Sequence, residues 1–374
     1  MTYSVYQHWD PLKVCVVGRS YPPEFYSWIK IPYVRKLFEK IAIETEEDYQ
    51  AIIKKLESFG VKILRPNLPT VTFVNGRYVQ PPMTPRDYTA MVGERFYQGY
   101  RYSIEQCYND VKDSAWPDCR SWEEFYQLPE CIRTECINQH GVGTVRTFCN
   151  EYEDIFDHIA AQGNKIYRST DITGAMLARI GKDLYLGTHS YNQDTTLVKQ
   201  QMDLEFPDYR NHVVNTGGHS DGTYCPVCPG LIISLKDVPT YANTFPDWEV
   251  VYLPGQSWDA VKPFMDLKHK NAGKWWIPGF EQDQAVVDTV ETWLGHWTGY
   301  VEETVFDVNM LIIDPKNVMV FNYNKQVFDA LDRFGITPHI VPFRHRYFWD
   351  GGIHCVTSDL HREGTLQDFF PNRQ

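Results

Sequence analysis

The sequence of 374 residues has no run of apolar residues long enough to span a bilayer, and no charged-then-apolar leader follows Met1. It also lacks an excess of basic residues, because 36 Lys and Arg stand against 48 Asp and Glu, which gives a formal net charge of −12. This balance argues against a surface that binds nucleic acid or membrane. Nine cysteines are an odd number, so we expect free thiols in a reduced, cytoplasmic protein.

A second pair of metal ligands is missing beside the CxxC pattern of Cys225 and Cys228. A structural zinc site needs four ligands at suitable spacing. A redox CxxC is expected to open a helix, whereas this one leads into an apolar strand pattern. We therefore interpret the two cysteines as structural and predict no metal site and no cofactor.

Hairpin patterns recur along the chain. Three segments pair two apolar runs across a turn that contains glycine or proline: 88–97, 175–187 and 310–321. Two predicted helices, 34–59 and 325–334, each end at a glycine and precede a short strand. With the strands expected at 14–17 and 231–234, a strand-rich module with one helix recurs about five times. This predicts an α/β fold, and the repetition indicates modules arranged radially, with loops that meet at a centre.

The stretch with the clearest chemistry is Asp350-Gly351-Gly352-Ile353-His354-Cys355. A Gly-Gly pair lets backbone and ligand approach closely, and polar residues surround the thiol, whereas a structural thiol is more often in an apolar run. The alternative is a small residue that closes a turn.

A second Gly-Gly stretch, at 217–218, is followed by His219 and Asp221. Two further carboxylates, Asp87 and Asp171, lie just ahead of the predicted hairpins. Each has an ordinary interpretation: a turn residue for Asp87, a cap for Asp171 and a core histidine for His219. Their recurrence at equivalent places favours the functional interpretation, in which these groups and Cys355 point into one cavity as the parts of a covalent thiol enzyme.

These residues also carry a resemblance that spans nearly the whole chain in order. The matching stretches are Trp9-Asp10-Pro11-Leu12, Val16-Val17-Gly18-Arg19, Pro85-Arg86-Asp87, Ala160-Ala161-Gln162-Gly163, Gly181-Lys182-Asp183, His219-x-Asp221, Val318-Met319-Val320, Gly335-Ile336-Thr337, Gly351-Gly352-Ile353-His354-Cys355 and Arg362-Glu363-Gly364-Thr365-Leu366-Gln367. The chain resembles the amidinotransferase family, within the superfamily of guanidino-modifying enzymes. The resemblance implies one domain over residues 1–374, a five-bladed α/β-propeller (pentein) of ββαβ modules around a central active site.

The resemblance also implies roles. Cys355 matches the family nucleophile, His219 the general acid and base, and Asp171 the carboxylate that orients the histidine. Asp87 and Asp221 match the carboxylates that hold the guanidinium.

Two positions depart from the family pattern. Val238 stands where the glycine amidinotransferases have an arginine for the donor's carboxylate, and Glu303 stands in the region where the family has a serine near the donor. Both make the pocket less suited to a free α-carboxylate, and they leave arginine as donor and glycine as acceptor open. Two stretches, 107–149 and 274–297, have no assigned counterpart and are interpreted as a lid or as a contact with a second copy in a homodimer.

The favoured hypothesis is transfer of an amidino group from a small guanidine donor, arginine or a related compound, to a primary amine acceptor through a covalent amidino-cysteine. The alternative is a guanidine hydrolase of the deiminase or dihydrolase type, because the same residues can run either reaction. A third hypothesis, a catalytically silent scaffold, predicts loss of the thiol, the histidine or a carboxylate, and all of these are present.

Overall fold

The computed structural model describes most of the chain. The described residues are 2–74, 76–99, 108–109, 111–113, 118–121, 124–125, 127–128, 132–133, 135–136, 150–169, 172–188, 193–235, 241–253, 277, 279–280, 283–294, 297 and 307–373.

The described residues form five three-stranded sheets with one common pattern. In each sheet the middle strand pairs antiparallel with one neighbour and parallel with the other. A helix joins the two parallel strands each time, as parallel pairing requires a crossover connection. The alternation of hairpin, helix and strand confirms the α/β class.

The sheets are β17 (Thr357–Arg362), β1 (Leu12–Val17) and β2 (Lys62–Leu64); β5 (Thr89–Val92), β6 (Arg95–Gly99) and β7 (Lys165–Ser169); β8 (Leu177–Ile180), β9 (Asp183–Gly187) and β10 (Arg210–Val214); β11 (Tyr224–Cys228), β12 (Leu231–Ser234) and β13 (Glu249–Tyr252); and β14 (Leu311–Asp314), β15 (Asn317–Val320) and β16 (Thr337–Ile340). Their crossover helices are α1 (Pro32–Glu57), α5 (Glu153–Ala161), α6 (Thr195–Glu205), α7 (Tyr241–Thr244) and α10 (Lys325–Arg333). The other elements are β3 (Phe73–Val74), β4 (Arg77–Tyr78), α9 (Gln284–Thr289), α11 (Arg346–Trp349), the short helices η1 (Pro23–Trp28), η2 (Pro85–Asp87), η4 (Asn150–Tyr152) and η5 (Ser220–Gly222), and the π-helical turn η6 (Val290–Leu294).

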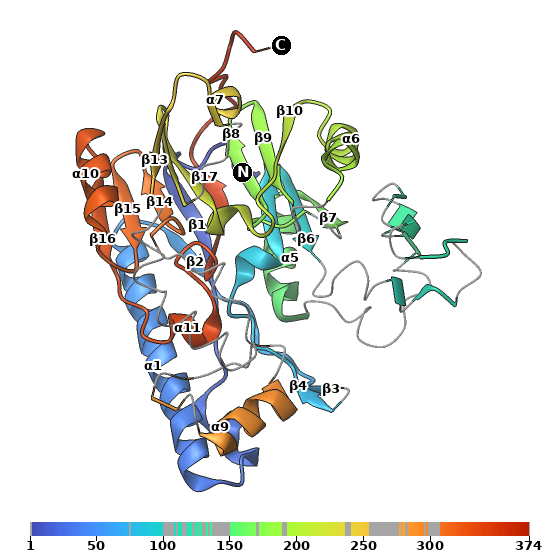
Figure 1. Ribbon diagram of the computed structural model, residues 1–374, viewed down its shortest axis with the longest axis vertical. Coiled ribbons are helices and arrows are strands. Elements are labelled where there is room, and N and C mark those ends of the chain that lie inside the picture. Colours follow the sequence, from blue (N-terminus) through green and yellow to red (C-terminus); the bar gives the residue numbers. More distant parts are fainter. Residues whose placement is uncertain are drawn as a thin grey trace.

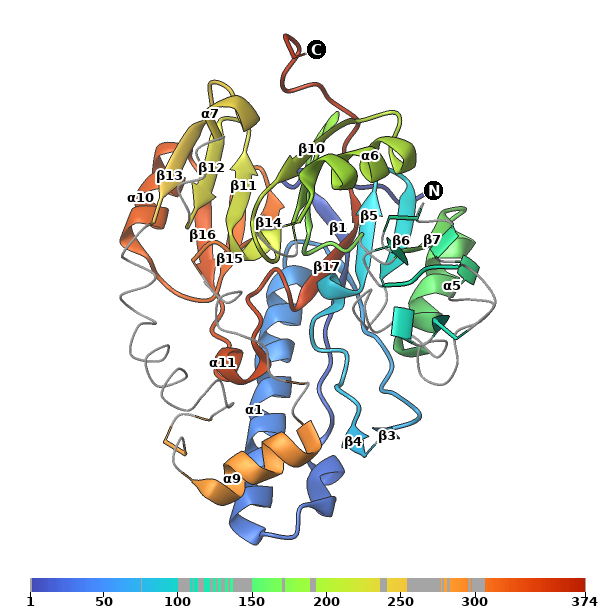
Figure 2. The same cartoon turned by 45° about the vertical axis from the view of Figure 1, so that its right-hand side comes forward.

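The two ends of the chain meet in one sheet, because β17 pairs antiparallel with β1. The sheets lie in the upper part of Figure 1, and α1 runs down from them to α9 and the β3–β4 hairpin at the lower end. Figure 2 shows the same arrangement from a second side.

Local sequence accounts for these elements. Pro32 occupies the first turn of α1, where its missing N–H costs nothing, and Gly60 follows the helix with φ of 74°. Asp194 caps α6 by accepting from the backbone N–H groups of residues 196 and 197, and Asn324 caps α10 in the same way. The predicted hairpins are confirmed as β5–β6, β8–β9 and β14–β15.

The apolar core lies between the sheets and their helices. One cluster joins α1, through residues such as Phe38 and Ile52, to Val17 of β1 and Met319 of β15. None of the described helices has both the length and the apolar character needed to cross a bilayer.

Cys225 and Cys228 lie within β11, both buried and both free thiols. Burial raises the pKa of Cys225 to about 12 and that of Cys228 to about 11, so both remain protonated at neutral pH. Across the part of the chain that the structure describes, no group of three or more His, Cys, Asp and Glu side chains could hold a metal ion.

Candidate active site

Cys355 lies in the loop that joins α11 to β17. Asp350 ends α11 with a left-handed φ of 49°, and the Gly351-Gly352 pair follows. The thiol is buried, with 2% of the residue exposed. The loop is tied to β1 because the N–H of Gly18 donates to the carbonyl of Val356 at 2.9 Å.

Asn309, just ahead of β14, clamps this loop from the side. Its Oδ1 accepts from the backbone N–H groups of His354 at 2.8 Å and Cys355 at 3.2 Å. Its Nδ2 donates to the Cys355 sulfur at 3.1 Å and to the Asp221 carbonyl at 3.2 Å. Gly352 lies against this amide, since a Cβ added there would be 2.2 Å from Asn309 Oδ1. The second glycine of the pair is therefore needed for a close approach of side chain to backbone.

Asp221 is the carboxylate beside the thiol. It belongs to η5, whose position is fixed to the start of β8 because Ser220 Oγ donates to the Met176 carbonyl at 2.8 Å. Asp221 Oδ2 accepts from His354 Nδ1 at 2.8 Å, and the Cys355 thiol donates to the same oxygen at 3.5 Å. The other oxygen, Oδ1, is buried and has no hydrogen-bond partner among the described residues.

His219 and Asp87 form a second, less buried pair. His219 Nδ1 lies 3.7 Å from Asp87 Oδ1, and the two side chains are 22% and 24% exposed. His219 stands two residues before Asp221 on η5, while Asp87 ends η2. The η5 segment thus connects the thiol–Asp221 contact to the His219–Asp87 contact.

A buried cluster of arginines around Asp359 supports the loop that carries Cys355 and the turn that carries Asp87. Arg86 Nε donates to the carbonyls of His354 and Thr357 at 2.8 and 2.9 Å, and its Nη1 binds Asp359 at 2.8 Å. Arg179 and Arg362 bind the same carboxylate. Since Arg86 directly precedes Asp87, this cluster holds the Asp87 turn against the Cys355 loop.

Burial and neighbouring charge control ionisation here. Burial, with the positive charge of Arg86, lowers the pKa of His354 to about 4. Burial acts to raise the pKa of Asp221, but the hydrogen bond from His354 and nearby positive groups outweigh it, so the net shift is downward. His354 is therefore neutral at neutral pH, and it donates its Nδ1 proton to an ionised Asp221.

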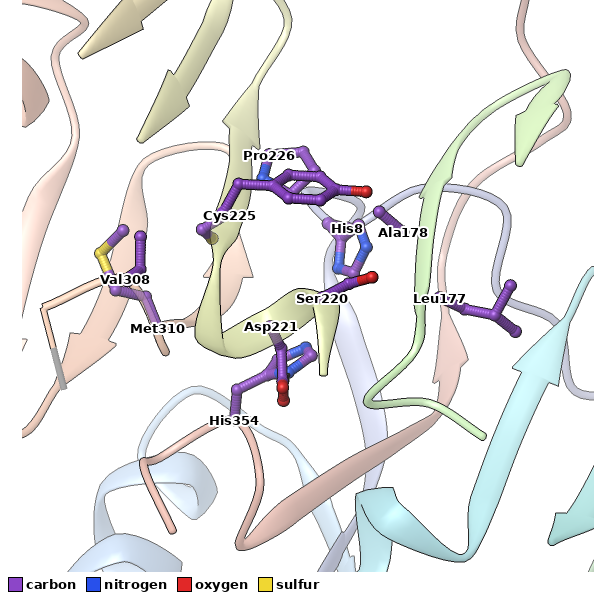
Figure 3. A pocket seen from close by; sticks show the side chains of 11 residues that line it. His8, Leu177, Ala178, Ser220, Asp221, Cys225, Pro226, Val308, Met310 and His354 are labelled. Carbon is purple, nitrogen blue, oxygen red and sulfur yellow. Dashed lines mark hydrogen bonds and ion pairs between the residues drawn. The ribbon is translucent and has the colours of Figure 1, made fainter. Parts of the chain in front are cut away.

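Figure 3 shows a small cavity beside Asp221 and His354, lined among others by His8 and Ser220. His8 accepts the backbone N–H of Arg179 at 3.1 Å. The cavity volume is about 10 Å³, which is room for about one water molecule. It is too small for a guanidine, so it is not a substrate pocket.

The structure brings together four of the seven site residues expected from the sequence: Cys355, Asp221, His219 and Asp87. The other three, Asp171, Val238 and Glu303, lie outside the described residues, as do most of stretch 107–149 and 8 of the 24 residues of stretch 274–297. Their roles stay predictions.

Sequence reasoning missed Asn309 and His354. A usable signal existed for Asn309, because it lies just ahead of the first strand of a hairpin, as Asp87 and Asp221 do. His354 directly precedes Cys355 in the motif that begins at Gly351, but nothing in the local sequence indicates that its ring binds Asp221.

No protein-family model matches the chain. Mitochondrial glycine amidinotransferase of Xenopus laevis is 24% identical over an alignment 410 residues long, gaps included, which covers 98% of this chain and 84% of that protein. Among solved structures, SxtG, an amidinotransferase from Microseira wollei in the saxitoxin biosynthetic pathway, superposes with a TM-score of 0.62 at 18% identity, covering 99% of this chain and 100% of that one. Inosamine-phosphate amidinotransferase StrB1 from Streptomyces griseus gives a TM-score of 0.60 at 17% identity, covering 98% and 99%.

The two solved structures show that the chain has the same α/β fold as these enzymes. The similarity in sequence extends over almost the whole chain. The resemblance to the amidinotransferases is thereby confirmed, and it supports an enzyme of the transferase class.

Proposed function

We propose that this protein is an amidinotransferase that moves an amidino group from a guanidine donor to a primary amine through a covalent amidino-Cys355. The observation that carries the proposal is the Asp221 carboxylate. It is buried beside the Cys355 sulfur with one oxygen that lacks a partner among the described residues. A guanidinium offers paired N–H donors and a positive charge, which suit a buried carboxylate that has a free oxygen among the described residues.

We further propose that residues 1–374 form one five-bladed propeller of ββαβ modules. Five sheets with the same pairing pattern support it, as does the pairing of β17 with β1, which joins the last module to the first. The loops ahead of the hairpins, which carry Asp87, Asp221 and Asn309, would then meet at the centre.

In the first half-reaction, Asp221 and Asp87 hold the guanidinium and present its central carbon to Cys355. As the cationic donor binds, the thiol releases its proton to solvent while His219 is protonated, and the thiolate attacks, which forms the C–S bond of a tetrahedral adduct. His219 gives a proton to the leaving nitrogen, the C–N bond breaks, and the first amine departs. An amidino group remains on the sulfur.

In the second half-reaction, the acceptor amine attacks the same carbon. His219 takes the proton that the amine loses, the C–S bond breaks, and the new guanidine leaves with the thiolate regenerated. One histidine thus acts first as acid and then as base. Asp171 would orient the His219 ring, a role that rests on the resemblance alone.

The proposed donor is arginine or a related guanidine, and the acceptor is a primary amine. The relatives named above differ in the acceptors their names imply, glycine and an inosamine phosphate among them. Val238 and Glu303 favour partners without a free α-carboxylate.

The test is a product assay with guanidino-labelled arginine and other labelled guanidines against a panel of amines, read by mass spectrometry. Transfer predicts a labelled guanidine that appears only when both substrates are present, and only in the wild type and not in Cys355→Ala. Labelled ammonia, citrulline or urea formed without any amine would instead identify a hydrolase and overturn the proposal.

A further inference from the structure

The amide of Asn309 uses its whole hydrogen-bonding capacity on the catalytic loops. Its oxygen accepts the backbone N–H groups of His354 and Cys355, and its nitrogen donates to the Cys355 sulfur and the Asp221 carbonyl. An amide has two donor hydrogens and two acceptor lone pairs. All four are therefore engaged.

These contacts also fix which end of the amide faces the sulfur. The backbone N–H groups of His354 and Cys355 need an acceptor, which is the amide oxygen, and the Asp221 carbonyl needs a donor, which is the amide nitrogen. A flipped amide would place donor against donor and acceptor against acceptor. The group that faces the Cys355 sulfur at 3.1 Å is therefore an N–H.

The surroundings leave the side chain little freedom. Asn309 is fully buried, and Gly352 packs directly on it, because a Cβ there would be 2.2 Å from Oδ1 and 2.5 Å from Cγ. An N–H donor held in this way at a buried sulfur favours the charged form of the thiol. The Asp221 carboxylate lies 3.5 Å from the same sulfur and disfavours a second negative charge there. The N–H of Asn309 acts in the opposite direction on the charge of the sulfur.

We propose that Asn309 is a positioning residue of the nucleophile: its amide holds the Cys355 sulfur beside Asp221 and stabilises it as a thiolate. The inference rests on the proposed function only in taking Cys355 as the nucleophile. A residue that merely braced the loop would change the stability of the fold without changing the ionisation of the thiol.

Two variants separate these roles. Asn309→Ser takes the amide N–H away from the sulfur without adding charge, because the shorter serine side chain ends its hydroxyl one bond closer to the backbone. Asn309→Asp keeps an oxygen for the two backbone N–H groups but places a carboxylate at the sulfur. The matched control is Asn164→Ser. Asn164 is a buried asparagine whose amide also bridges backbone groups, accepting from the N–H of Tyr3 and donating to the carbonyls of Tyr3 and Glu94, and none of these three partners is a thiol.

The readout is the ultraviolet absorbance of the thiolate, titrated with pH as the difference between each protein and the same protein carrying Cys355→Ala. This needs neither a reagent that reaches the buried sulfur nor a substrate. We expect the midpoint for Cys355 to rise by about one pH unit in Asn309→Ser, which is about tenfold less thiolate below the midpoint. The rise should be larger in Asn309→Asp, and Asn164→Ser should match the wild type.

An unchanged midpoint in folded Asn309→Ser would overturn the proposal, including the case in which only Asn309→Asp shifts, since that is an effect of added charge. Should Asn309→Asp fail to fold, as judged by a thermal melt, Asn309→Ser decides alone. Absence of amidino transfer in the wild type would refute the proposed function but leave this titration valid, so the two failures are distinguishable. With a donor in hand, Asn309→Ser should lower kcat more than it raises KM.

Discussion

Gly352→Ala tests the packing of the thiol loop. The new Cβ would lie 2.2 Å from Asn309 Oδ1, whereas ordinary contacts begin at 3.4 Å, so the amide or the loop must move by about 1.2 Å. A movement of that size breaks two to four of the hydrogen bonds of Asn309. At roughly 1 kcal/mol for each bond, we expect a loss of about 2–4 kcal/mol in the free energy of unfolding.

The neighbouring Gly351→Ala is the matched control. Its Cβ would meet Thr84 Cγ2 at 3.1 Å and Val356 Cγ1 at 3.4 Å, both ends of side chains that can adjust by a few tenths of an ångström. Neither glycine has a positive φ, so alanine introduces no backbone strain at either position.

The assay is a thermal melt of both variants together with the thiolate titration of Cys355. For a chain of this length, Gly352→Ala should lower Tm by roughly 3–5 °C and raise the titration midpoint, and Gly351→Ala should stay within about 1 °C of the wild type. Equal melting temperatures and equal titrations for the two variants would refute the account of the Gly-Gly pair.

Three further predictions concern charge. Asp359→Asn removes the carboxylate that three buried arginines share, and we expect thermal melts to show a loss of about 3–5 kcal/mol in the free energy of unfolding. The control Glu363→Gln breaks an exposed pair with Lys13 and should cost less than about 1 kcal/mol. Similar losses in the two variants would contradict a stabilising role of the buried cluster. The pKa of His354 is lowered to about 4 in the folded protein, so between pH 6.5 and 4 the unfolded chain takes up a proton that the folded protein does not, and stability falls as the pH drops through this window. In melts at each pH, His354→Gln should lose about 3 kcal/mol less stability across this window than the wild type. An equal loss would count against a neutral, buried His354. Val238→Arg should lower KM for arginine in the transfer assay if Val238 occupies the donor's carboxylate site, and an unchanged KM would argue against that match.

Much of the fold could be predicted because its local signals are strong. Gly93 and Gly181, at the turns of two predicted hairpins, both adopt positive φ, and Gly60 does so just beyond α1. The pairing of β17 with β1 could not be predicted from local patterns, since it joins segments at opposite ends of the chain whose pairing depends on the closure of the whole arrangement.

The site was predictable to the extent that its chemistry is carried by side chains in distinctive loops. Cys355 and Asp221 follow Gly-Gly pairs in the sequence, and the sequence predicts both as site residues. Asn309 stands beside no Gly-Gly pair. Its place just ahead of a hairpin was a usable signal, but its importance comes from backbone groups of the loop that carries Cys355 and from the carbonyl of Asp221. Contacts of that kind follow from tertiary structure, which residue type alone does not specify.

The most direct test of the central claim is intact-mass spectrometry of the protein mixed with a panel of guanidines, arginine included, and quenched in acid before the acceptor is added. The account predicts an added mass of one amidino group, located on Cys355 by peptide mapping and absent from Cys355→Ala. In a parallel sample, addition of the correct amine before the acid quench should remove the added mass and yield the new guanidine. Amidino transfer at full rate by Cys355→Ala, or an adduct on any other residue, would contradict the account.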